Sequence, residues 1–281
     1  MNNTEINLRS YDNVEYVQLN EFSEEQRRMY LKEKMQSAET NADFINKYIF
    51  NGIPLNICEI GSGNSKLLYL LEQQKILETG VGYEVSTSRW KMANYFAKEV
   101  GSKKVLNINK NFLDDIPQND IYDLIIMVDI VFNIIGSLYE DAEEEAISWM
   151  YRSLKPGGGI FLELQDCTDT KVEIARSGGV IRKWEEYDIS DPFQYGLHEI
   201  KIDEDDNIVY EKIFIKRDLS GKDRFKNVIK SYSVNEISNL LKKGGFEVEV
   251  YPCFDSEKEE IEEIKKGVYK KELYRVLARK K

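Results

Sequence analysis

Residues 55–64 read Leu-Asn-Ile-Cys-Glu-Ile-Gly-Ser-Gly-Asn, and they decide the fold of this chain. An apolar run rich in strand-forming residues ends at Glu59, and a turn containing Gly61 and Gly63 follows. Glycine permits a positive φ and lets the backbone approach a ligand closely. Residues 65–71 then read as an opening helix whose leucines can face a sheet. A strand, a glycine turn and a helix in this order predict an α/β fold that binds a nucleotide at the carboxyl end of its first strand.

The fingerprint of dinucleotide-binding folds is incomplete here, because the position of its third glycine holds Lys66. Residues 59–63, Glu-Ile-Gly-Ser-Gly, instead resemble motif I of the class I S-adenosylmethionine (SAM) methyltransferases. Residues 79–84, Thr-Gly-Val-Gly-Tyr-Glu, resemble the second strand of that family, which ends in the acid that holds the adenosine ribose. The carboxylate of Glu84 can accept hydrogen bonds from both ribose hydroxyls. The alternative is another doubly wound fold with glycines in its first turn.

Two later stretches extend the resemblance to the family's adenine and methyl-donor sites. Residues 111–114, Asn-Phe-Leu-Asp, follow a short third strand, where Asn111 would lie beside the adenine and Phe112 would cover the ring. The family more often has aspartate at the position of Asn111. Residues 122–129, Tyr-Asp-Leu-Ile-Ile-Met-Val-Asp, are nearly all apolar, which is typical of a central parallel strand buried on both faces. They resemble the family's fourth strand, which ends at the methyl donor.

Residues 154–162, Leu-Lys-Pro-Gly-Gly-Gly-Ile-Phe-Leu, resemble the family's turn into strand five. The resemblance therefore covers about residues 51–165. It implies SAM as the cofactor, S-adenosylhomocysteine as the product and no metal. The implied cofactor residues are Glu59, Gly61, Ser62, Gly63, Asn64, Glu84, Val85, Asn111, Phe112, Val128 and Asp129, with Tyr11 and Tyr16 on an N-terminal arm that would fold over the cofactor.

The resemblance implies an α/β fold with a doubly wound, seven-stranded, mostly parallel sheet, and the remaining pattern predicts an inserted antiparallel part. Residues 195–202 and 208–216 alternate as strands around an acidic turn, which predicts a hairpin, and residues 227–232 could add a strand. Ser-Glu-Glu-Gln at 23–26 and Ser-Val-Asn-Glu at 233–236 are capping boxes that begin helices. The expected organisation is an N-terminal arm and helical lid (1–50), a SAM-binding core (51–165), an antiparallel insertion (166–232), and a last helix with strands six and seven (233–281).

The only histidine, His198, lies in the expected hairpin together with Tyr195. In a regular strand His198 shares a face with Ile200 and Ile202. An imidazole with a pKa near ~6.5 could take a proton from an acceptor, so His198 and Tyr195 are the candidate catalytic residues. The alternative interpretation of His198 is an ordinary histidine packed beside apolar neighbours.

Composition excludes several classes of partner. Lys and Arg number 39 against 50 Asp and Glu, a net charge of −11 that disfavours binding to nucleic acid. Cys58, Cys167 and Cys253 lack metal-ligand spacing, so a zinc site is not expected. The polar N-terminus does not resemble a signal peptide, and the apolar run Leu124–Ile135 is too short to span a bilayer. We therefore expect a cytoplasmic protein without membrane partners.

These observations favour a SAM-dependent methyltransferase that acts on a small-molecule acceptor. An antiparallel insertion after strand five resembles the small-molecule N-, O- and C-methyltransferases, in which the added strands cover the mouth of the site. Inserted strands vary on a shared core, so the acceptor atom stays open. Three alternatives remain: a protein or peptide methyltransferase, a non-catalytic SAM-binding regulator, and a nicotinamide oxidoreductase.

Overall fold

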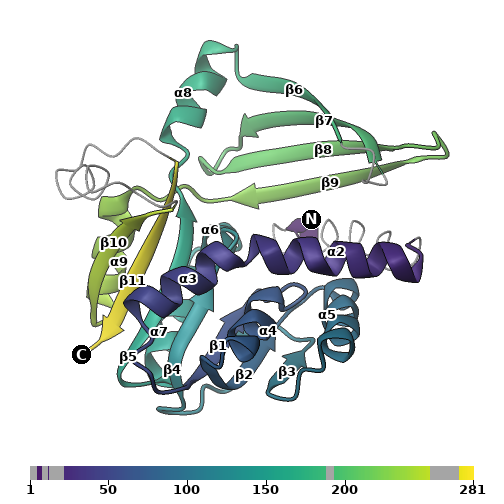
Figure 1. The fold of residues 1–281 in the computed structure, drawn as a ribbon. Helices are drawn as coiled ribbons and strands as arrows, with labels where there is room; N and C mark the ends of the chain where they lie inside the picture. The colour runs from purple at the N-terminus through teal and green to yellow at the C-terminus, as the bar shows by residue number, and fades with distance from the viewer. Residues whose placement is uncertain (1–4, 8–11, 13–21, 188–192, 254–271) are drawn as a thin grey trace.

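The computed structural model describes residues 5–7, 12, 22–187, 193–253 and 272–281. Within these ranges the chain forms a seven-stranded sheet with the order β10-β11-β5-β4-β1-β2-β3 and a four-stranded sheet with the order β6-β7-β8-β9 (Figure 1). The larger sheet carries the helices, and the smaller sheet stands beside it, on the side where helix α2 lies. The predicted α/β fold class with a separate antiparallel insertion is confirmed.

Five parallel strands make the centre of the larger sheet: β1 (Leu55–Ile60), β2 (Leu77–Tyr83), β3 (Val105–Ile108), β4 (Tyr122–Met127) and β5 (Leu154–Gln165). Their apolar, β-branched residues suit strands that are buried on both faces. Because the strands are parallel, their carboxyl ends meet at one edge of the sheet. The loops that carry the predicted cofactor residues therefore gather there.

The far side of the sheet is antiparallel. Strand β11 (Leu273–Lys280) pairs with β5, and β10 (Phe246–Pro252) pairs with β11. Both strands had been expected at nearly these positions. The capping box at Ser233 begins helix α9 (Val234–Lys243), which connects the insertion back to β10.

Helices cover both faces of the larger sheet, so the sheet is doubly wound. On one face, buried side chains of β1, β4 and β5 pack against Phe44, Ile45 and Leu68. On the other face, buried side chains of the same strands pack against Ile147, Met150 and Leu241. The helices around this sheet are α2 (Glu24–Ser37), α3 (Glu39–Tyr48), α4 (Lys66–Gln73), α5 (Thr87–Val100), α6 (Val131–Gly136), α7 (Ala142–Ser153) and the 3₁₀ turn η1 (Phe112–Asp114). Across the described ranges, no helix combines the length and the apolar character that crossing a bilayer requires.

The sequence predicts one helix over residues 138–154, and the structure has α7 at Ala142–Ser153 there. Helix α6 (Val131–Gly136), which precedes it, was not predicted. Gly136 packs against the hydroxyl of Tyr232, so that α6 lies close to the chain leaving the insertion. Helix α6 therefore starts directly at the end of β4, beside the candidate site.

The insertion is antiparallel throughout, as predicted for its hairpin, and is larger than expected. It contains β6 (Val180–Glu186), β7 (Phe193–Ile202), β8 (Ile208–Lys216) and β9 (Lys222–Ile229), preceded by helix α8 (Thr168–Arg176). Strand β6 and helix α8 were not predicted. The third strand of the prediction, residues 227–232, is β9 at residues 222–229.

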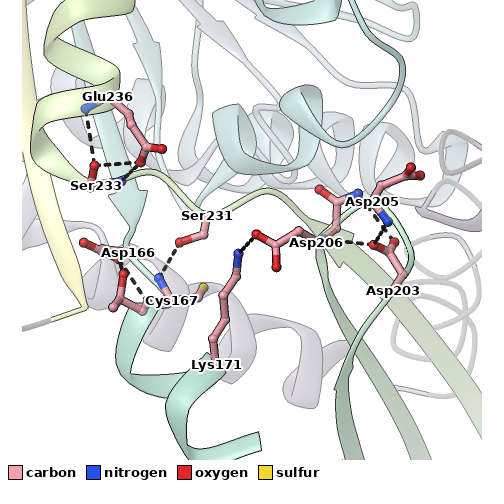
Figure 2. A network of polar contacts seen from close by, with 11 residues as sticks. Asp166, Cys167, Lys171, Asp203, Asp205, Asp206, Ser231, Ser233 and Glu236 are labelled. Carbon is pink, nitrogen blue, oxygen red and sulfur yellow. Dashed lines mark hydrogen bonds and ion pairs between the residues drawn. The ribbon is translucent and has the colours of Figure 1, made fainter. Parts of the chain in front are cut away.

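Polar contacts join the two chain segments that connect the insertion to the core (Figure 2). The backbone N–H of Cys167 donates to Ser231 Oγ at 2.8 Å, which ties the entering segment to the leaving one. Lys171 of α8 pairs with Asp206 in the β7–β8 turn. Fully buried Asn133 of α6 donates to the carbonyls of Gln165 and Lys230 at 2.8 and 2.7 Å. These contacts hold the insertion on α6.

Replacing Asn133 by alanine should destabilise the fold. The change leaves two buried carbonyls and the N–H of Gln165 without the side chain that pairs with them. We expect the free energy of unfolding to fall by about 1–3 kcal/mol, measured by urea denaturation. Asn51→Ala, which removes an exposed contact to the N–H of Ile53, is the matched control and should change it by under about 0.5 kcal/mol. Equal effects of the two variants would contradict this role of Asn133.

Candidate functional site

A cavity of about 570 Å³ opens at the carboxyl ends of β1, β2 and β4. Its walls come from the loops after these strands and from helix α2. Tyr11 and Tyr16 lie outside the described residues. The remaining predicted cofactor residues all line this one cavity: Glu59, Gly61, Ser62, Gly63, Asn64, Glu84, Val85, Asn111, Phe112, Val128 and Asp129.

The glycine turn after β1 forms the floor of the cavity. Gly61 has φ +68° and lies against Val131, so a Cβ at this position would stand 2.6 Å from Val131 Cγ2. Only glycine fits both this backbone conformation and this contact. Gly63, with φ +56°, donates its backbone N–H to Glu84 Oε2 at 2.8 Å. The turn thus connects the ends of β1, β2 and β4.

Glu84 at the end of β2 is held in place by backbone groups. Its Oε2 accepts from Gly63, and its Oε1 accepts from the N–H of Ser86 at 2.7 Å. A carboxylate oxygen has a second lone pair, so the oriented group can still accept from a ligand hydroxyl. Asp12 of the N-terminal arm accepts from Ser86 Oγ at 2.6 Å, which places part of the arm beside this loop.

The walls on either side combine aromatic, polar and charged residues. Phe112 is buried and meets Trp149 edge to face, with ring centroids 5.2 Å apart. Asn111 caps η1, because its Oδ1 accepts from the N–H of Leu113 at 3.2 Å. On the other side Asp129 reaches Lys66 at the start of α4, with 3.2 Å between Oδ2 and Nζ.

Glu59 is the most unusual group in the cavity. It is 2% exposed, and its Oε2 has no hydrogen-bond partner among the described residues. Burial raises the pKa of Glu59 to about 8; Lys66 opposes this shift, while Asp129 and Glu84 add to it. The hydroxyl of Ser62 is likewise buried without a partner in this part of the chain. A buried, unpaired carboxyl among other acids suits a cationic ligand.

No protein-family model matches this chain, and no curated protein matches its sequence. Solved structures match its fold. A SAM-dependent methyltransferase from Clostridium acetobutylicum is 16% identical, with a TM-score of 0.66 over 87% of this chain and 91% of that one. The CcbJ methyltransferase from Streptomyces caelestis is 14% identical, with a TM-score of 0.62 over 86% and 94% of the two chains.

A third structure is a SAM-bound amino pentose methyltransferase from Micromonospora echinaspora. It is 12% identical to this chain, with a TM-score of 0.58 over 92% of this chain and 98% of that one. This chain has the class I methyltransferase fold.

In this class I methyltransferase fold, the two candidate catalytic residues lie on the inserted sheet and outside the cavity lining. His198 Nε2 lies 2.9 Å from Glu185 Oε2 and faces Lys212 on β8. Burial lowers the pKa of His198, and Lys212 lowers it further, while Glu185 opposes both. Pairing is regular from Tyr195 to Ile202, so Tyr195 lies on the opposite face of β7 from His198. The structure therefore does not bring these two side chains together.

Several residues that line the cavity of this chain were not predicted from the sequence. Tyr30 and Lys34 of α2 line the cavity, and the Lys34 ammonium lies 4.9 Å from the Tyr30 ring centroid. Arg89 of α5 and Asn7 near the N-terminus also line it. The spacing of four residues between Tyr30 and Lys34 places both on one helix face. This spacing is the sequence feature from which the pair could have been predicted.

The pKa of Glu59 makes stability depend on pH. Its folded-state pKa, about 8, exceeds the ordinary value of 4.5, so the ligand-free fold loses stability as the pH rises between these values. Glu59→Gln removes this loss. We expect the stability gain of the variant over wild type to grow by up to ~1 kcal/mol per pH unit from pH 5 to 8 and then level off. Urea denaturation of ligand-free protein at several pH values measures it.

The control for this prediction is Glu78→Gln, which changes an exposed carboxylate on the neighbouring strand β2. Its stability difference from wild type should stay nearly constant with pH. A constant difference for Glu59→Gln as well would show that the pKa of Glu59 is not raised.

Proposed function

We propose that this chain is a SAM-dependent methyltransferase acting on a small-molecule acceptor. The observation that carries the proposal is the buried Oε2 of Glu59, which no described residue pairs with, in a cavity lined by the predicted cofactor residues. SAM contains an ammonium group and a sulfonium, and either charge would compensate this carboxylate. When bound, SAM would supply an electrophilic methyl group for transfer to the acceptor, with S-adenosylhomocysteine displaced in line as the leaving group.

The residues present fit the parts of SAM. Glu84 would accept from the ribose hydroxyls, and Phe112 with Asn111 would bracket the adenine. Glu59 would bind the ammonium group. Gly61 leaves room for Val131, which lines the cavity, to pack on the glycine turn, since a Cβ there would stand 2.6 Å from Val131 Cγ2. The assignments of Glu84, Asn111 and Phe112 follow the resemblance, and all the residues named line the cavity.

The charges of the site favour SAM over a nicotinamide dinucleotide. Glu59 and Glu84 lie at the ends of β1 and β2, so a pyrophosphate bound at the glycine turn would lie beside two carboxyl groups. The Gly63 N–H, which a pyrophosphate would need, already donates to Glu84. Dinucleotide binding relies on free backbone N–H groups at such a turn. The oxidoreductase alternative is correspondingly disfavoured.

The protein's contribution to catalysis would be mainly placement. Methyl transfer by in-line displacement needs donor and acceptor aligned in a water-poor cavity, and such alignment can supply much of the rate. The apolar side chains of Val131, Ile134 and Leu138 line one side of the cavity and exclude water there. A base is needed only where the acceptor must lose a proton.

A small acceptor is favoured by the inserted sheet. Asn7 in the N-terminal segment lines the cavity and bonds to both the N–H and the carbonyl of Val228 on β9, at 2.8 and 3.2 Å. The insertion is thus connected to the cavity wall, which leaves less room for a polypeptide substrate. One structure with a similar fold is an amino pentose methyltransferase. We propose a cytoplasmic enzyme of this general kind.

SAM and S-adenosylhomocysteine should stabilise the protein, whereas NAD should not. A ligand at 100 times its dissociation constant adds about 2.7 kcal/mol to the stability of the folded state. A thermal-shift titration with the three ligands and with adenosine measures this. Equal shifts with NAD, or no shift with either sulfur-containing ligand, would refute the assignment.

His198 is proposed as the base, in its neutral form. The lowered pKa keeps the imidazole able to accept a proton at pH 7. If it serves this role, His198→Ala should lower turnover on an amino-sugar acceptor about 10²–10⁴-fold with SAM affinity unchanged. Arg182→Ala, on the adjacent strand β6 but exposed, is the control and should keep full turnover. Turnover of His198→Ala within a few-fold of wild type would make His198 structural.

A further inference from the structure

The turn that follows β4, here called the β4 turn and comprising residues 128–131, is strained. Its two central residues, Asp129 and Ile130, have φ values of +54° and +59°. A turn with positive φ at both central positions is dominated by glycine, asparagine and aspartate. A β-branched isoleucine there is an outlier. Such a conformation persists only where the surrounding structure imposes it, and strain of this kind clusters at functional sites.

The β4 turn closes one side of the cavity. Val128, Asp129 and Val131 all line it. Val131 packs on Gly61, at the distance that excludes any side chain there, and Asp129 pairs with Lys66. The strained turn therefore connects the end of β4 to the glycine turn after β1. Relaxation of the turn would move Val131 away from Gly61 and open this contact.

A buried carboxylate from β5 holds the β4 turn from behind. Glu163 Oε2 accepts from the backbone N–H of Asp129 at 3.1 Å. Its other oxygen lies 3.4 Å from both Nε and Nη2 of Arg275, and the two side chains are 12% and 6% exposed. Arg275 in turn donates to Asn41 Oδ1 at 2.7 Å. Glu163 itself does not line the cavity.

We propose that Glu163 is a positioning residue that keeps the β4 turn in its strained form and so shapes the cofactor cavity. The inference rests on the proposed function only in the choice of S-adenosylhomocysteine as the ligand whose affinity is measured. A carboxylate is required because both of its oxygens accept from donors, one from Asp129 and one from Arg275. A glutamine offers only one acceptor oxygen, so it would turn its NH₂ group toward one of these donors.

The test is a double-mutant cycle of Glu163→Gln and Ile130→Gly, with S-adenosylhomocysteine affinity measured by calorimetry. Glu163→Gln should weaken binding about ten- to a hundredfold, the loss expected for a hydrogen bond to a charged group. Glycine adopts positive φ without strain, so Ile130→Gly should keep the β4 turn in place when the contact between Glu163 and the N–H of Asp129 is lost. We expect it to recover at least about fivefold of the lost affinity in the Glu163→Gln background.

The matched control is Leu219→Gly, which relieves an equivalent positive φ of +59° in the exposed β8–β9 turn. It should recover nothing, because distant sites act additively. If Ile130→Gly also recovers nothing, Glu163 is only half of a buried ion pair, and the proposal is overturned. If Glu163→Gln does not fold, Glu163→Asp keeps the charge opposite Arg275 while it shortens the reach to Asp129, and the same cycle applies.

The same cycle, followed by thermal denaturation of ligand-free protein, separates this proposal from the proposed function. Ile130 packs on a buried apolar cluster of the insertion, so Ile130→Gly should lower the melting temperature of wild type. It should lower the melting temperature of Glu163→Gln by less, because there it also relieves the β4 turn. The two substitutions could have non-additive effects on the melting temperature while wild type fails to bind S-adenosylhomocysteine. That result would contradict the proposed function and still support the role of Glu163 in holding the β4 turn. If the two substitutions change the melting temperature additively, Glu163 does not hold the β4 turn, whatever ligand the protein binds.

Discussion

A carboxyl group buried at the end of a central parallel strand requires compensation, and the site of this chain is arranged around that requirement. Glu59 is buried, one of its oxygens has no partner within the described part of the chain, and burial raises its pKa to about 8. Parallel strands bring Glu84 and Asp129 to the same edge, while Lys66 supplies the nearby positive charge. In the proposed complex the cation of SAM completes this arrangement. The buried carboxyl of Glu59 therefore lowers the stability of the ligand-free fold and favours the binding of a cation.

The fold was largely predictable because its core signals are local. The apolar runs of β1 and β4 belong to strands buried on both faces, and helix α5 (Thr87–Val100) is capped by Ser86 and ended by Gly101. The errors have physical reasons. Strand β6 is an edge strand with mostly exposed, charged residues, so its sequence lacks a strand's alternation. Helix α6 starts from Ile130 in a left-handed conformation, which sequence propensities disfavour.

The candidate site was predictable where its residues follow strand ends, and not where tertiary packing supplies them. Motif I and Glu84 lie directly after β1 and β2, so their sequence positions fix their place in the cavity. Tyr30 and Lys34 reach the cavity only because α2 packs beside α4 and α5. Glu163 acts from β5 through the backbone of Asp129, and no sequence spacing relates these two residues. The acceptor depends on the insertion, whose strands follow no motif.

The central claim is that this cavity binds SAM through oriented carboxylates, and a calorimetric titration with S-adenosylhomocysteine tests it most directly. Glu84→Ala should weaken binding by roughly 1.5–3 kcal/mol, the range for hydrogen bonds to charged groups, with the fold retained. Glu78→Ala, which removes an exposed carboxylate from the same strand, should bind like wild type. Equal affinities for wild type, Glu84→Ala and Glu78→Ala would contradict the account.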